Sequence, residues 1–155
     1  MVVGVISDTH NLLRPEVKAA LGDVQSIIHA GDIGAPDILA ELRKLAPVYA
    51  VHGNTDRYPI TEELRDREVF YLGGIQVFVA HIGGRPPEMR RYYPEIKGCQ
   101  LVVFGHSHRA QLQIDEGTLF LNPGSAGPRR FSLPVTMAKV TIEDGRVDAS
   151  IIKLL

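Results

Sequence analysis

Short apolar runs recur along this chain, and a side chain of a type that binds metal ions follows closely after each of them. The runs and their polar residues are 2–6 with Asp8, 27–28 with Asp32, 48–51 with Asn54, 77–80 with His81, and 101–104 with His106. Short apolar runs of this kind are typical of buried strands. Strands that each deliver such a donor predict a sheet protein with a dinuclear metal site at one end of the strands.

The order of the segments indicates two sheets. In the first half, helix-like residues 14–21 and 36–45 alternate with the strands, which predicts a parallel sheet covered by helices. In the second half, hairpins are expected around Gly73-Gly74, around the turn that ends in Gly117 and around residues 143–146, with a further helix over 87–93. We therefore expect an α/β fold, a four-layer α/β/β/α sandwich of two mixed sheets flanked by helices.

Length and composition narrow the class of protein. The 155 residues have the length of one ordinary domain, so residues 1–155 are expected to form a single domain. A formal net charge of -1 without a basic stripe disfavours a nucleic-acid partner. No apolar run is long enough for a membrane span, the first residues do not read as a signal peptide, and the single Cys99 cannot form an internal disulfide. These features favour a cytoplasmic location and leave open whether the chains form a homo-oligomer.

The donor types point to particular metals. Carboxylate, imidazole and amide donors without thiolates suit divalent manganese, iron, zinc, cobalt or nickel. Asp8 and His10 are two residues apart, so at the end of an extended strand their side chains would point to the same side and hold one ion. His106 and His108 have the same spacing, and the same geometry is expected of them. Gly105 before this pair permits a close approach of the backbone.

The ordered motifs Asp8-x-His10, Gly31-Asp32, Gly53-Asn54-x-Asp56, His81 and Gly105-His106-x-His108 resemble the signature of the calcineurin-like metallophosphoesterases, in particular their small bacterial and archaeal phosphodiesterases. The resemblance implies the sandwich fold and two divalent ions per chain, with manganese favoured. It also implies a ligand set for each ion: Asp8, His10, Asp32 and His108 for the first, and Asp32, Asn54, His81 and His106 for the second. Asp32 would bridge the two ions.

Two ions about 3.5 to 4 Å apart would polarise a phosphoryl oxygen, activate a water to hydroxide and stabilise the leaving oxygen. Neither Ser7 nor Cys99 lies in a frame typical of a catalytic nucleophile. We therefore expect a metal-dependent phosphodiesterase that hydrolyses a small phosphodiester by attack of metal-bound hydroxide. Its catalytic residues are expected to be Asp8, His10, Asp32, Asn54 and Asp56. The alternatives are a phosphomonoesterase of the same fold and a non-catalytic binding scaffold like the retromer subunit that this superfamily also resembles.

Several residues beside these motifs have expected roles of their own. Many members of the superfamily carry a histidine where this chain has Thr55, and that histidine helps to protonate the leaving group. Substrates with good leaving groups should therefore be favoured here. Asp56 is expected to orient His10 or another ligating imidazole. His29 and His52, which lie close to ligands in the sequence, are expected to be structural.

Overall fold

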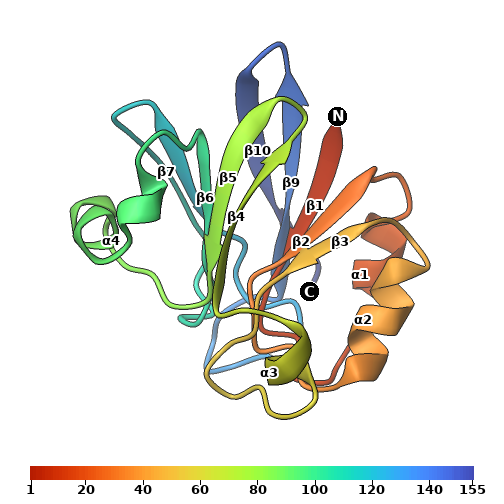
Figure 1. The fold of residues 1–155 in the computed structure, drawn as a ribbon. Coiled ribbons are helices and arrows are strands. Elements are labelled where there is room, and N and C mark those ends of the chain that lie inside the picture. The colour runs from red at the N-terminus through yellow and green to blue at the C-terminus, as the bar shows by residue number, and fades with distance from the viewer.

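The computed structural model describes residues 1–155 and consists of two five-stranded sheets that face each other (Figure 1). The first sheet has the order β10-β9-β1-β2-β3, with β1 at Val2–Ile6, β2 at Ser26–His29, β3 at Val48–Ala50, β9 at Thr136–Glu143 and β10 at Arg146–Lys153. β1, β2 and β3 are parallel, as the alternation of strands and helices predicts. The β9–β10 hairpin pairs antiparallel with β1, which makes the sheet mixed.

The second sheet is also mixed. Its order is β4-β5-β6-β8-β7, with β4 at Arg67–Leu72, β5 at Ile75–Ala80, β6 at Leu101–Val103, β7 at Gln111–Asp115 and β8 at Thr118–Asn122. β5, β6 and β8 are parallel, while β4 and β7 are antiparallel edge strands. Gly73 and Gly74 join β4 to β5 with φ values of 58° and 85°, a left-handed turn that glycine adopts without steric cost. All three predicted hairpins are confirmed.

Helices cover the outer face of each sheet. α1 (Pro15–Ala20) and α2 (Pro36–Arg43) pack on the first sheet, and α4 (Pro86–Tyr92) with the 3-10 turn η1 (Pro94–Ile96) packs on the second (Figure 1). These helices α1, α2 and α4 begin at prolines, whose fixed φ suits a first helical turn. The predicted helices are confirmed to within two residues at their ends. The short helix α3 (Ile60–Glu63) has no counterpart in the sequence-based expectation.

The four layers follow from the alternation of side chains along strands that are buried on both faces, as β1 shows. Val3 and Val5 belong to the buried cluster between the two sheets, whereas Ile6 belongs to the cluster under α1 and α2. Gly4 leaves room on the helix side, because a Cβ there would lie 2.2 Å from Leu21 Cδ2. A third cluster lies between the second sheet and α4. The predicted α/β/β/α sandwich is confirmed.

The loops that follow β1, β2, β3, β5 and β6 gather at one end of the sandwich. In Figure 1 this is the lower end, where α3 also lies. None of the helices combines the length and the apolar character that crossing a membrane requires. The consequence for function is that five separate loops are available to build one site.

Candidate metal centre

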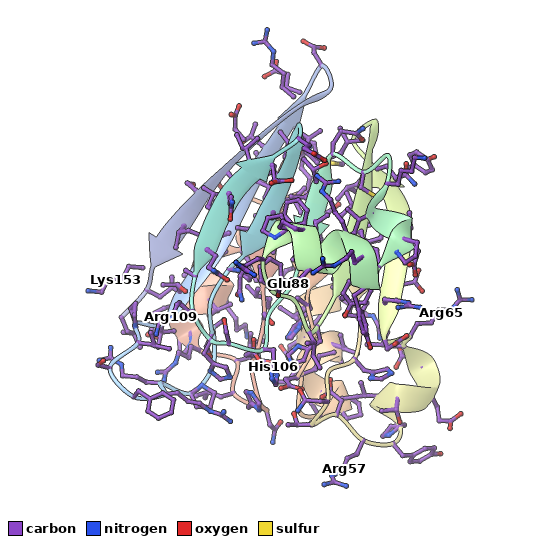
Figure 2. The ribbon with its side chains drawn as sticks, turned by 90° about the vertical axis from the view of Figure 1, so that its left-hand side faces the viewer. Arg57, Arg65, Glu88, His106, Arg109 and Lys153 are labelled. Carbon is purple, nitrogen blue, oxygen red and sulfur yellow. The ribbon has the colours of Figure 1, made fainter.

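All seven side chains with predicted ligand roles lie in these loops. Asp8 and His10 follow β1, Asp32 follows β2, Asn54 follows β3, His81 follows β5, and His106 and His108 follow β6. Figure 2 shows the side chain of His106 at this end of the molecule. Three loops of the first sheet and two loops of the second sheet therefore contribute donors to the same place.

Asp8, His10 and His108 form a first group of donors, whose candidate ligand atoms lie within 4.8 Å of one another. Asp8 Oδ1 is 3.6 Å from His10 Nε2 and 3.4 Å from His108 Nε2. These distances exceed those of good hydrogen bonds. A carboxylate and two imidazoles spaced in this way suit a divalent ion placed between them.

Asp32, His81 and His106 form a second group, also within 4.8 Å. Asp32 Oδ2 lies 3.1 Å from His81 Nε2, and Asn54 Oδ1 lies 3.1 Å from His106 Nδ1, which brings the amide to the same group. Asp32 Oδ2 is also 3.6 Å from His10 Nε2 in the first group. The Asp32 carboxylate therefore lies between the two groups.

Four buried polar atoms of this cluster have no hydrogen-bond partner: Asp8 Oδ1, His10 Nε2, His81 Nε2 and His108 Nδ1. Such an unpaired atom costs about 1–3 kcal/mol, and native proteins rarely leave one without a reason. His81 shows the reason most clearly. Its Nδ1 lies 2.8 Å from the carbonyl oxygen of Ala30, so Nδ1 carries the proton and the lone pair of Nε2 faces Asp32. The residues present thus fit divalent cations.

The backbone explains how near neighbours in sequence reach different groups. Asp8 and His10 share one group, but His106 and His108 belong to different groups. The expectation from spacing that this second pair holds one ion is therefore wrong, whereas the ligand sets implied by the family resemblance divide the pair in the same way. That expectation assumed an extended strand. All four residues instead have positive φ, at 57°, 45°, 72° and 61° in chain order, because β1 and β6 end before them and the chain turns tightly. The alternation rule of strands does not apply in such loops.

Asp8 is held by groups from both sheets. Its Oδ2 accepts hydrogen bonds from the Ser7 hydroxyl at 2.7 Å and from the backbone N–H of His106 at 3.1 Å. The close approach depends on Gly105, since a Cβ there would lie 2.1 Å from Ser7 Oγ and 2.8 Å from Asp8 Oδ2. The expectation of a close backbone approach at Gly105 is confirmed.

The carboxylates of the site are ionised. Burial acts to raise the pKa of Asp8, but the imidazoles around it and the Ser7 hydroxyl outweigh burial and hold this pKa well below its usual range. Burial likewise acts to raise the pKa of Asp32, yet His81 and the N–H of Thr55 lower it to about 2. Burial acts to lower the pKa of His81, but the neighbouring carboxylates outweigh it and raise this pKa above its ordinary value. The site therefore presents negative charge to a cation.

Asp56 has a different role from the one predicted. Its carboxylate accepts hydrogen bonds from the backbone N–H groups of Ile33 at 2.9 Å, Gly34 at 3.0 Å and Gly53 at 2.8 Å. The expectation that Asp56 orients an imidazole is wrong, because these backbone groups take up its oxygens. Asp56 instead ties the loop after β2 to the loop after β3.

Ser7 and Thr9 lie on either side of Asp8 and have no structural role among the sequence-based predictions. Ser7 donates to Asp8, and the Thr9 hydroxyl donates to the carbonyl of Ile33 at 2.8 Å and lies 3.0 Å from His29 Nε2. Both hydroxyls are fully buried. The sequence does contain a signal for these roles: two hydroxyl residues flank the predicted ligand Asp8 directly after a buried apolar run. Buried hydroxyl groups need hydrogen-bond partners.

His29 is structural, as expected. It is fully buried, and the Gly31 N–H donates to its Nδ1 at 3.1 Å, so the proton of the neutral ring lies on Nε2, next to Thr9. Burial lowers the pKa of His29 to about 4. His29 therefore supports the loops that carry Asp8 and Asp32 as a neutral ring.

The fold is a sandwich of two mixed sheets, and carboxylates and imidazoles from five loops converge at one end of it. These features define a class of α/β proteins with a candidate metal centre at the strand ends. A model of the calcineurin-like phosphoesterase superfamily domain matches residues 1–145, and the chain belongs to this superfamily. The predicted family is confirmed.

Two relatives illustrate this membership. A probable metallophosphoesterase of Methanothermobacter thermautotrophicus is 38% identical over 161 residues, which cover 99% of this chain and 92% of the relative. A phosphodiesterase of Methanocaldococcus jannaschii is 26% identical over 141 residues, which cover 80% of this chain and 83% of the relative. The chain is thus similar over most of its length to proteins named as phosphoester hydrolases.

A solved structure supports the fold. Vps29 of Entamoeba histolytica, complexed with zinc, superposes with a TM-score of 0.77 over 100% of both chains at 23% sequence identity. At this identity the likeness concerns the fold alone.

Proposed function

We propose that this protein is a cytoplasmic dinuclear-metal phosphodiesterase that hydrolyses small phosphodiesters, with residues 1–155 as one catalytic domain. The observation that carries the proposal is that the two donor groups meet at Asp32. Its Oδ2 is 3.1 Å from His81 Nε2 and 3.6 Å from His10 Nε2. One carboxylate between two cations offsets the charge of both, and this makes a two-ion site favourable.

The donor groups suggest which residues would hold each ion. The first ion would be held by Asp8, His10, Asp32 and His108, and the second by Asp32, Asn54, His81 and His106. When bound, such a pair of ions polarises a phosphoryl oxygen, activates a water and stabilises the leaving oxygen. Manganese is the favoured metal, with nickel, zinc, iron and cobalt as alternatives, because the donors are imidazoles, carboxylates and an amide.

The residues around the donors prepare the site for this chemistry. Ser7 and the N–H of His106 fix the Asp8 carboxylate, and Asp56 fixes the spacing of two ligand-bearing loops. Thr55 stands where many members of the superfamily have histidine, and its hydroxyl cannot act as a cationic acid near neutral pH. Esters with good leaving groups should therefore react fastest.

The proposal predicts metal content and activity together. After manganese loading, elemental analysis should give about two ions per chain. The same sample should hydrolyse bis(4-nitrophenyl) phosphate faster than 4-nitrophenyl phosphate. The Asp8→Ala, His106→Ala double variant should fall to background, since it removes donors from both groups. The single variant His106→Ala should lose the second ion and retain the first.

Each other outcome has a definite meaning. Faster turnover of the monoester would indicate a phosphomonoesterase of the same fold. A chain that binds no ions and is inactive would favour the binding scaffold. Two ions retained in His106→Ala would contradict the assignment of this histidine to the second ion.

A further inference from the structure

A cavity of about 420 Å³ extends from the candidate metal centre toward α4. His81 of the second donor group lines it, as does Asn54, whose amide oxygen lies 3.1 Å from His106 of the same group. The end away from the metal centre is lined by α4, on which Figure 2 labels Glu88. The volume lies in the range of cavities that bind small organic molecules. A phosphoester at the metal centre would therefore have this cavity beside it.

One wall of the cavity is apolar and aromatic. Ile82 and Tyr92 line it and are 48% and 73% exposed. Tyr93 also lines the cavity and is fixed by a hydrogen bond from its hydroxyl to the carbonyl of Ile82 at 2.7 Å and by an edge-to-face contact with Tyr92 at 4.9 Å between ring centroids. Exposed apolar side chains scattered singly are ordinary on a surface. Ile82 and Tyr92, in contrast, border one cavity beside the proposed phosphoester site, and together they form a surface for a planar apolar group.

The charged residues of the cavity are unsuited to a second anionic group. Arg67, the arginine in the lining, forms an ion pair with Glu95 at 2.9 Å and lies over the Tyr93 ring at 5.4 Å. Glu88 accepts hydrogen bonds from Arg85 at 2.6 and 2.9 Å. Asp66 also lines the cavity and forms no ion pair within 4.0 Å, so its carboxylate repels anions and can accept an N–H.

We propose that this cavity binds a neutral planar ring carried by the phosphoester substrate, a nucleobase or a simple aryl group, against Tyr92 and Ile82. The inference rests on the proposed function, because it places the phosphate of the same molecule at the candidate metal centre. The substrate class is then a small phosphodiester in which one ester group bears an aromatic ring. Stacking on tyrosine is tolerant of ring type, whereas Asp66 would favour rings with N–H donors.

Direct binding tests the proposal without requiring turnover. Calorimetric titration of the manganese-loaded protein would compare ethylphosphonate, phenylphosphonate and thymidine 5′-monophosphate, which share an anionic phosphorus group. The ligands with rings should bind at least about tenfold more tightly than ethylphosphonate. Tyr92→Ala should reduce this preference at least about fivefold. Tyr71→Ala is the matched control, because Tyr71 is equally exposed at 73% and lies outside the cavity lining, and it should leave the preference unchanged.

The outcomes separate the two proposals. A stronger preference for thymidine 5′-monophosphate supports a nucleoside ester, and a stronger preference for phenylphosphonate supports a simple aryl ester. Equal binding of all three ligands, or a preference that survives Tyr92→Ala, overturns the cavity proposal and leaves the hydrolytic proposal standing. If the wild-type, metal-loaded protein does not hydrolyse phosphodiesters, the proposed function is overturned and this inference with it.

Discussion

His29 illustrates how a buried side chain couples the site to pH. Its Nδ1 accepts the N–H of Gly31, so a second proton on the ring would face another donor in a fully buried position. Burial accordingly lowers its pKa from 6.5 to about 4. Because the unfolded chain binds the proton more readily, stability from this residue is complete above pH 6.5 and is lost as the pH falls toward 4.

The lowered pKa of His29 predicts the effect of His29→Asn in the metal-free protein. Asparagine can accept from Gly31 but does not titrate, so the variant should lose less stability than the wild type between pH 7 and pH 4. The difference should be about 3 kcal/mol, from a pKa shift at about 1.36 kcal/mol per unit. Urea unfolding at several pH values in the presence of a chelator measures it. Parallel pH dependences in the two proteins would show that His29 is not the group responsible.

At the scale of residues, the sequence predicts which side chains meet better than it predicts how. Asp8, Asp32 and His81 come together as expected, because donors at the ends of neighbouring strands must converge. The backbone conformation of the loops could not be foreseen, since positive φ in an aspartate or a histidine leaves no trace in composition. For that reason the argument from spacing wrongly placed His106 and His108 on one ion, although the ligand sets implied by the family resemblance separate them. The attachment of Asp56 to backbone N–H groups was also mispredicted.

The loop after β6 is the element in which space is most restricted. Gly105 leaves no room for a side chain, because a Cβ there would overlap Ser7 Oγ and lie close to Asp8 Oδ2. Gly105→Ala should displace the Ser7 hydroxyl from Asp8 and destabilise the fold by about 1–3 kcal/mol, the usual cost of overpacking. It should also weaken ion binding by the first donor group. Denaturant unfolding and metal titration would measure the two effects.

Gly22→Ala serves as the comparison for that variant. Gly22 follows α1, and an added Cβ would lie 3.3 Å from the carbonyl oxygen of Ala19, a smaller intrusion with no metal-ligand donor within 4 Å. Its ion binding should equal that of the wild type. If both alanine variants bind manganese equally well, the fit around Gly105 does not control the position of Asp8.

At the scale of elements, local signals predicted most of the architecture. Gly73-Gly74 and the prolines at helix starts mark boundaries that the structure reproduces, because both residue types restrict the backbone locally. These local signals do not predict which strand pairs with β1 on the side opposite β2. The β9–β10 hairpin joins the first sheet rather than the second, and nothing in its own alternation distinguishes the two sheets.

At the scale of the whole molecule, the two sheets meet at the candidate metal centre. Donors from the first sheet face donors from the second, so an ion bound between them links the two halves of the sandwich. Because the unfolded chain cannot present this arrangement, bound ions should stabilise the protein. At free ion concentrations one hundred times the dissociation constant, the gain is about 2.7 kcal/mol per site.

This stabilisation should depend on pH through the imidazoles. The lowered pKa values keep Asp8 and Asp32 ionised down to low pH, whereas the raised pKa of His81 lets protons compete with ions from a higher pH. Manganese content and the metal-dependent rise in Tm should therefore be greatest at pH 8 and largely lost by pH 5. Elemental analysis and thermal unfolding at both pH values measure them. Equal metal content at pH 8 and pH 5 would argue against ligation by histidines.

The position of β1 between β2 and β9 also has a consequence for the chain as it is made. β1 pairs with β9 through Val3 opposite Val140 and Val5 opposite Ala138. A ribosome adds about 5–20 residues per second, so roughly 7 to 27 seconds pass between the synthesis of these two strands. During that interval the apolar edge of β1 that later pairs with β9 is unpaired. For most of it His108, which shares the first donor group with Asp8, has not yet been synthesised. Binding of an ion by the first donor group would therefore come late in synthesis, after a period in which the unpaired edge of β1 can pair with other chains.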